Sequence, residues 1–178
     1  MTCIVALSHD SKIYMGSDSA GSDGWTVLIR RDPKIYRVGG MLIGFTTSFR
    51  MGQLLGYSLT LPEHHADIPI ERYMATSFID AVRGCLKTGG YATKKDEVES
   101  GGQFLVAYRN RIFEVEPDFQ VSESETEFAA VGSGFMLALG SLHASAGRDP
   151  EFRVLAALGA AEAFCASVRG PMHVEVLS

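Results

Sequence analysis

Residues 1–21 read MTCIVALSHDSKIYMGSDSAG, and an apolar run begins almost directly after the first methionine. Cys3–Leu7 and Lys12–Gly16 are short apolar runs on either side of the polar turn 8–11, a pattern that predicts a β-hairpin. Thr2 therefore stands immediately before the first strand. Either the sheet merely ties down the chain end, or the position of Thr2 has a chemical purpose.

The composition predicts one compact domain that spans residues 1–178. Hydrophobic residues make up 46% of the 178 residues, enough for a sizeable core. The net charge is −5 and basic residues form no run, so there is no electrostatic reason to expect nucleic acid as a partner. No apolar stretch approaches the roughly 20 residues of a membrane helix, and no secretion signal is recognisable. We therefore expect a cytoplasmic protein without a membrane partner.

Neither the cysteines nor the histidines have the spacing of a metal site. Cys3, Cys85 and Cys165 are far apart in the chain, and we expect them to be reduced thiols. The pair His64-His65 has no suitably spaced third ligand and is expected to lie in a solvated loop. The sequence thus predicts no metal and no cofactor.

Groups of strands alternate with pairs of helices along the rest of the chain. Further strands are expected at Trp25–Ile29, Lys34–Val38, Met41–Thr46, Gln103–Tyr108, Ile112–Glu116, Phe119–Val121, Glu127–Val131 and Met172–Leu177. Helices are expected at 48–59, 70–87 and 135–146 and from Pro150 onward, with Asp149 as the N-cap of the last. Residues 94–100, KKDEVES, are expected to form a charged connector. This order predicts an α+β fold, a four-layer αββα sandwich of two antiparallel sheets between helical layers.

Four polar features each have an ordinary structural explanation. Asp18 follows the second strand, where an acid is typical of a turn. Lys34 begins a later strand, where a lysine is most often solvated. Gly132-Ser133-Gly134 precedes a helix, and its serine is typical of a helix cap. A threonine at position 2 is common.

Taken together, these features resemble the proteasome β-subunit family of N-terminal nucleophile (Ntn) hydrolases, and its HslV-like members in particular. Counted from Thr2, Asp18 and Lys34 fall without gaps on the family's acid and lysine positions. The segment GFTTSFRMGQLL (44–55) occupies the place of the family's glycine-rich corner. The segment VGSGFMLALGSL (131–142) is similar to the family's GSG motif. The resemblance extends from Thr2 to the last strand.

The resemblance implies a threonine peptidase. Once Met1 is removed, Thr2 would carry its own general base, an α-amino group whose unperturbed pKa is about 7.7–8.0. Lys34 would lie close to the Thr2 hydroxyl and favour its deprotonation, and Asp18 would pair with Lys34 and hold it in place. The enzyme would attack a peptide carbonyl and form an acyl-enzyme on Thr2.

The resemblance also assigns supporting residues and partners. Ser133 would form a hydrogen bond near the amino terminus and help to move the proton, and the backbone N–H of Thr47 would stabilise the oxyanion. The expected assembly is a homo-oligomeric ring that encloses the sites. The expected partners include a peptide or unfolded-protein substrate, and an ATPase unfoldase is a candidate partner.

Two departures from the family's pattern keep alternatives open. Thr47 stands where the family usually has glycine. The stretch 165–170 contains no acid at the place where the family has one; Ser167 could take the place of that acid, but Arg169 could not. A catalytically silent, ring-forming scaffold on the same fold and a small-molecule Ntn amidase are therefore the alternatives. The roles of Trp25, core or substrate cleft, and of Phe45 and Phe49, core or specificity pocket, also stay open.

Overall fold

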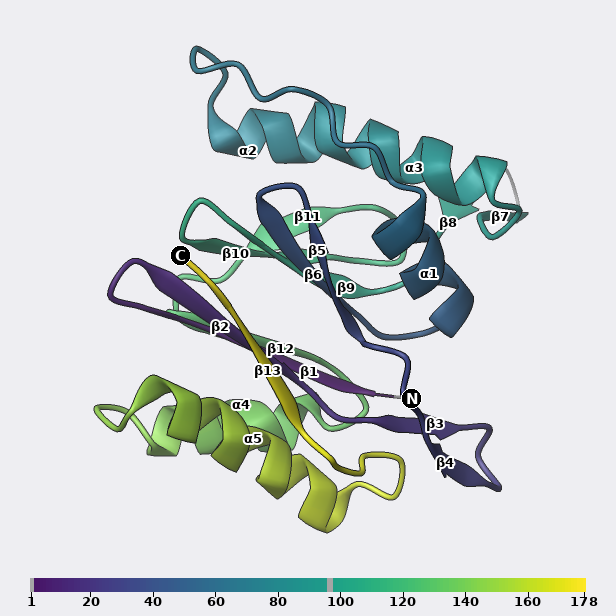
Figure 1. The fold of residues 1–178 in the computed structure, drawn as a ribbon. Coiled ribbons are helices and arrows are strands. Elements are labelled where there is room, and N and C mark those ends of the chain that lie inside the picture. Colours follow the sequence, from purple (N-terminus) through teal and green to yellow (C-terminus); the bar gives the residue numbers. More distant parts are fainter. Residues whose placement is uncertain (1, 96–97) are drawn as a thin grey trace.

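The computed structural model describes residues 2–95 and 98–178, and they fold into four layers (Figure 1). Two antiparallel sheets lie face to face, with the helical residues 49–57 and 70–88 over one sheet and the helical residues 135–144 and 150–164 over the other (Figure 1). The predicted αββα sandwich is confirmed. Met1 lies outside the described residues, so the structure does not test the expected removal of Met1.

The sheet that carries the N-terminus has four strands in the order β12-β1-β2-β13. Their bounds are β1 Cys3–His9, β2 Lys12–Ser17, β12 Phe128–Gly132 and β13 His173–Leu177. The predicted first hairpin is confirmed, but β1 extends two residues closer to the turn than expected, to His9, and β2 ends one residue later, at Ser17. Asp10 and Ser11 have φ angles of 47° and 60°, as the two central residues of a tight type I′ hairpin turn require.

The second sheet has five strands in the order β11-β10-β9-β6-β5. Their bounds are β5 Ile35–Val38, β6 Met41–Phe45, β9 Phe104–Tyr108, β10 Arg111–Val115 and β11 Val121–Glu123. Two small hairpins lie outside both sheets: β3 Ala20–Ser22 pairs with β4 Val27–Ile29, and β7 Thr93–Lys95 pairs with β8 Val98–Ser100. The second hairpin corrects the expectation of an irregular connector at 94–100, and β3 was not expected at all.

The helices form at the expected places with one difference. Their bounds are α1 Phe49–Tyr57, α2 Ile70–Tyr73, α3 Ile79–Thr88, α4 Phe135–Ala144 and α5 Pro150–Phe164. The single helix expected over 70–87 contains a π-helical segment, η1 Met74–Phe78, between α2 and α3. Asp149 caps α5 as predicted, because its carboxylate accepts the N–H of Phe152 at 2.9 Å.

Strand β1 separates two of the three hydrophobic cores. Cys3, Val5 and Leu7 face α4 and α5, whereas Ile4 and Ala6 pack between the two sheets. Side chains alternate along a strand, so Thr2 belongs to the face of Ile4 and opposite to Cys3. Among the described residues, no helix is both long and apolar enough to cross a membrane.

Candidate active site

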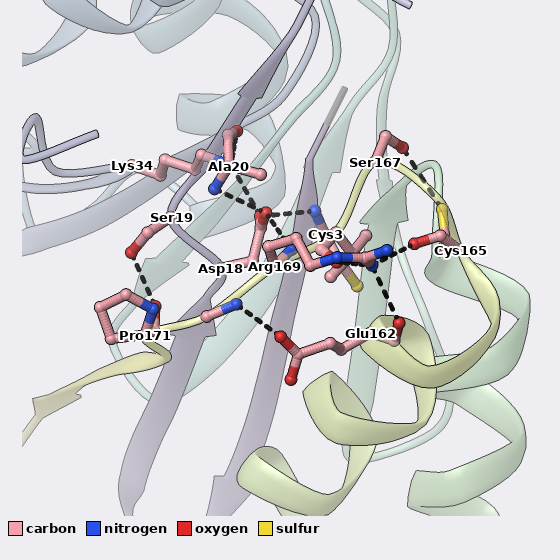
Figure 2. Close-up of polar contacts among 12 residues, drawn as sticks. Cys3, Asp18, Ser19, Ala20, Lys34, Glu162, Cys165, Ser167, Arg169 and Pro171 are labelled. Atoms are coloured by element: carbon pink, nitrogen blue, oxygen red, sulfur yellow. Dashed lines mark hydrogen bonds and ion pairs between the residues drawn. The ribbon is translucent and has the colours of Figure 1, made fainter. Parts of the chain in front are cut away.

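Asp18, directly after β2, is the centre of a buried polar cluster near the start of β1 (Figure 2). Its Oδ1 accepts a hydrogen bond from the Lys34 ammonium at 2.7 Å and from the N–H of Cys3 at 3.1 Å. Its Oδ2 accepts the N–H of Ala20 at 3.0 Å. The carboxylate thus ties Lys34 to the residue that follows Thr2.

Lys34 is a buried ammonium group rather than a solvated strand-edge lysine. Besides Asp18, its Nζ donates to the carbonyl oxygen of Ala20 at 2.6 Å, and it lies 5.8 Å from the ring centroid of Phe49. Burial lowers the pKa of Lys34, and the charge of Asp18 opposes that shift. The Asp18 carboxylate thus offsets part of the cost of burying the Lys34 charge, and a charge in a desolvated setting acts more strongly on its surroundings than one in water.

Thr2 is clamped by the turn that precedes α4. Its carbonyl oxygen accepts the N–H of Ser133 at 2.8 Å, and only 3% of the residue is exposed. Gly132 has a φ of 95°, and a Cβ at this position would lie 2.0 Å from the Thr2 carbonyl oxygen. Only glycine fits here, which gives the GSG motif a physical reason. Ser133 meets Thr2 through its main chain; its side chain is exposed, and the proton-transfer role of its hydroxyl stays a prediction.

Thr47 has a backbone conformation that is unusual for a β-branched residue, with a φ of 60°. Its side chain compensates, because its Oγ1 accepts the N–H of Gln103 at 3.1 Å. The preceding residue, Thr46, donates its own N–H and its hydroxyl to the Gln103 carbonyl oxygen at 3.1 and 2.8 Å. The Thr47 hydroxyl thus stabilises the turn between β6 and α1, where the family usually has glycine. The oxyanion role of the Thr47 N–H stays a prediction.

A groove of about 260 Å³ adjoins this corner. Its lining includes Thr47 and Phe49 and, from the β3–β4 region, Gly21, Leu28 and Arg30. The guanidinium of Arg30 lies 4.0 Å from the ring centroid of Phe49. Phe49 is thus half-buried at the groove, whereas Phe45 is part of the core, and Trp25 is 97% exposed and lies neither in the core nor among the groove residues.

The sequence did not point to the turn at 165–171 as a support for Asp18. The N–H of Arg169 donates to Asp18 Oδ2 at 3.3 Å, whereas the sequence had excluded Arg169 only as a substitute for the missing acid. Ser167 is buried, and its hydroxyl lies 3.3 Å from the Cys165 sulfur. No side-chain signal reveals a main-chain donor, because every residue except proline carries one.

The side chains of Cys3 and His64 are not part of the cluster around Asp18 and Lys34. Cys3 is buried against the α4–α5 layer, and this burial raises the pKa of its thiol to about 12, which keeps it protonated and unreactive. His64 is not simply solvated, because its ring stacks on Tyr73 and lies 3.0 Å from the Tyr108 hydroxyl. Within residues 2–95 and 98–178, no three His, Cys, Asp or Glu side chains are grouped so as to hold a metal ion.

No protein-family model and no curated protein matches the sequence. Solved structures match it over nearly its whole length. BPH from Thiobacillus denitrificans, in complex with epoxomicin, has a TM-score of 0.81 at 24% identity and covers 99% of both chains. HslV from Trypanosoma brucei has a TM-score of 0.70 at 18% identity and covers 99% of both chains.

A third similar structure is Anbu, an "ancestral beta-subunit" from Yersinia bercovieri. It has a TM-score of 0.68 at 14% identity and covers 98% of this chain and 81% of its own. The chain has the proteasome-like Ntn-hydrolase fold. The resemblance inferred from Thr2, Asp18, Lys34 and the GSG turn is thereby confirmed for the fold, while the chemistry of this chain depends on its own residues.

Proposed function

We propose that this chain is an N-terminal threonine peptidase, with Thr2 as its nucleophile after removal of Met1. The observation that carries the proposal is the buried Asp18–Lys34 pair, which is bonded to the N–H of Cys3, the residue next to Thr2. A buried ion pair contributes little to stability as such, so its position beside a chain terminus favours a chemical role.

In the first step, the free α-amino group of Thr2 takes the proton of its own hydroxyl. The ammonium of Lys34 favours the developing negative charge on Oγ. Thr2 Oγ then attacks the carbonyl carbon of a peptide bond, and the N–H of Thr47 donates to the oxyanion that forms. Asp18 touches neither reacting atom; it holds Lys34 in place.

In the second step, the tetrahedral intermediate collapses. The C–N bond of the substrate breaks, the leaving amine takes the proton from the α-ammonium of Thr2, and an ester on Thr2 Oγ remains. The same amine, free again, then takes a proton from water, and the water oxygen attacks the ester carbonyl. The bond between the carbonyl carbon and Thr2 Oγ breaks, Oγ takes the proton back from the α-ammonium, and the acid is released. Ser133 passes protons close to the terminus in both steps.

We further propose that residues 1–178 act as one domain within a homo-oligomeric ring in the cytoplasm. Large apolar side chains on the outer helices support the assembly: Met136 and Phe164 are 73% and 80% exposed. Such apolar surface is typical of an interface. The ring would enclose the sites, with unfolded protein as substrate and an ATPase unfoldase as a possible partner.

The test compares wild type with Thr2→Ala and the conservative control Thr2→Ser on fluorogenic peptides. We expect Thr2→Ala to abolish hydrolysis and Thr2→Ser to keep part of it, because serine retains both amine and hydroxyl. Unchanged hydrolysis in Thr2→Ala would refute the proposal. A stable oligomer without hydrolysis would point to the scaffold alternative, and cleavage of small amides but not of peptides would point to the amidase.

A further inference from the structure

Arg169 places one guanidinium nitrogen against three main-chain carbonyl oxygens. Its Nη1 donates to the carbonyls of Glu162 at 3.1 Å, Cys165 at 3.1 Å and Val168 at 2.6 Å (Figure 2). Glu162 lies in the last turn of α5, where a helix leaves its carbonyl groups unpaired and carries partial negative charge. Cys165 directly follows the helix and its carbonyl also accepts the N–H of Val168 at 3.2 Å, while Val168 lies further along the turn. The guanidinium donates hydrogen bonds to these carbonyls, and its positive charge offsets the partial negative charge at the helix end.

The main chain of the same residue reaches the candidate active site. The N–H of Arg169 donates to Asp18 Oδ2 at 3.3 Å, and its carbonyl oxygen accepts the N–H of Ser19 at 2.9 Å. Arg169 therefore connects the end of α5 with the loop after β2. Through Asp18 this connection continues to Lys34 and to Cys3.

Neighbouring contacts fix the rest of this turn. The Glu162 carboxylate accepts the N–H of Gly170 at 2.8 Å, and the Ser19 hydroxyl donates to the carbonyl oxygen of Pro171 at 2.6 Å. Neither contact reaches the three carbonyls beneath the guanidinium. Removal of the Arg169 side chain would thus leave the turn attached through Gly170 and Pro171 and through the N–H of Val168 on the Cys165 carbonyl, but would remove all three contacts of the guanidinium with main-chain carbonyls.

We propose that Arg169 is a positioning residue of this site, whose guanidinium fixes the turn at 165–170 so that the turn's N–H holds Asp18 and, through it, Lys34. This inference rests on the proposed threonine chemistry. Arginine suits the task, because its guanidinium is always charged and offers several donors in a fixed plane. A loss of such positioning lowers catalysis more than it weakens substrate binding.

The test measures kcat and KM of Arg169→Ala on fluorogenic peptides, with and without free guanidinium at concentrations far below those that unfold the protein. We expect kcat to fall roughly ten- to a hundredfold with little change in KM. Added guanidinium should restore part of the lost kcat by occupying the vacated position. The matched control is Arg148→Ala, which removes an exposed arginine and should leave kcat unchanged with or without guanidinium.

An unchanged kcat in Arg169→Ala would overturn the proposal, and so would a lowered kcat that guanidinium does not raise. Should Arg169→Ala not fold, Arg169→Gln keeps two donors without the charge. It is expected to lower kcat at constant KM, and wild-type kcat in that variant would equally overturn the proposal. Labelling of Thr2 by epoxomicin separates the two levels: an unlabelled wild type refutes the threonine chemistry itself, whereas equal labelling rates in wild type and Arg169→Ala refute only the positioning role.

Discussion

Replacement of Asp18 by alanine should cost much more free energy of unfolding than replacement of Lys34 by methionine. The two side chains are 0% and 1% exposed and 2.7 Å apart. Breaking a buried ion pair by removing one partner costs about 3–5 kcal/mol. In Asp18→Ala, the N–H groups of Cys3, Ala20 and Arg169 also lose their acceptor, and each buried orphan donor costs about 1–3 kcal/mol.

Replacement of Lys34 by methionine leaves more of the cluster's hydrogen bonds intact than replacement of Asp18 by alanine. In Lys34→Met, the Asp18 carboxylate keeps its three main-chain donors, and such donors stabilise an ionised carboxylate. We therefore expect a loss of about 2–3 kcal/mol for Lys34→Met and at least about 4 kcal/mol for Asp18→Ala. The second loss approaches the total stability of about 5–15 kcal/mol of an ordinary domain.

Urea unfolding followed by far-UV circular dichroism measures both losses. The protomer concentration must be held constant, because assembly into an oligomer adds to apparent stability. Should Asp18→Ala not fold, Asp18→Asn retains one acceptor oxygen and provides a lower bound. A Lys34→Met variant that loses as much stability as the Asp18 variants, or more, would refute the reasoning that Asp18 is the centre of the cluster.

Three further changes test other parts of the site. Gly132→Ala should lower the free energy of unfolding by roughly 2–4 kcal/mol and abolish most hydrolysis, because the added Cβ would clash with the Thr2 carbonyl oxygen. The control Gly140→Ala has open space around the added Cβ and should raise the free energy of unfolding by roughly 0.5–1 kcal/mol, as measured by thermal unfolding. Thr47→Val should lower kcat, with little effect on KM, and cost about 0.5–1.5 kcal/mol, since the hydrogen bond from the Gln103 N–H to the Thr47 hydroxyl is lost at an exposed position. Burial raises the pKa of Glu114 from 4.5 to about 7, so the folded state holds a proton that the unfolded state releases. The free energy of unfolding should therefore decrease as pH rises from 4.5 to 7, and this decrease should be smaller in Glu114→Gln.

The fold could be predicted from the sequence because its signals are local. Apolar runs, turn residues and helix caps such as Asp149 each depend on neighbours in the chain. The π-helical segment at Met74–Phe78 could not be predicted, because the apolar stripe on either side of it keeps an ordinary helical spacing. The hairpin β7–β8 was missed because its charged sequence is typical of a loop.

The candidate site was predictable where side-chain chemistry carries it. The resemblance to the family implied that Asp18 and Lys34 form a pair, and the structure describes their ion pair. The main-chain contributions were not predictable, because any residue can provide them. Gly132 is fixed by a contact with a carbonyl oxygen far away in sequence, and Arg169 was set aside for its side chain while its N–H holds Asp18.

The mass of the N-terminal peptide after incubation with epoxomicin tests the central claim most directly. Epoxomicin is the molecule bound in one of the similar structures. We predict a peptide that begins at Thr2 and carries the added mass of the inhibitor, together with loss of peptide hydrolysis and no adduct in Thr2→Ala. A protein that hydrolyses peptides at full rate while Met1 remains attached, or an adduct on any other residue, would contradict the account.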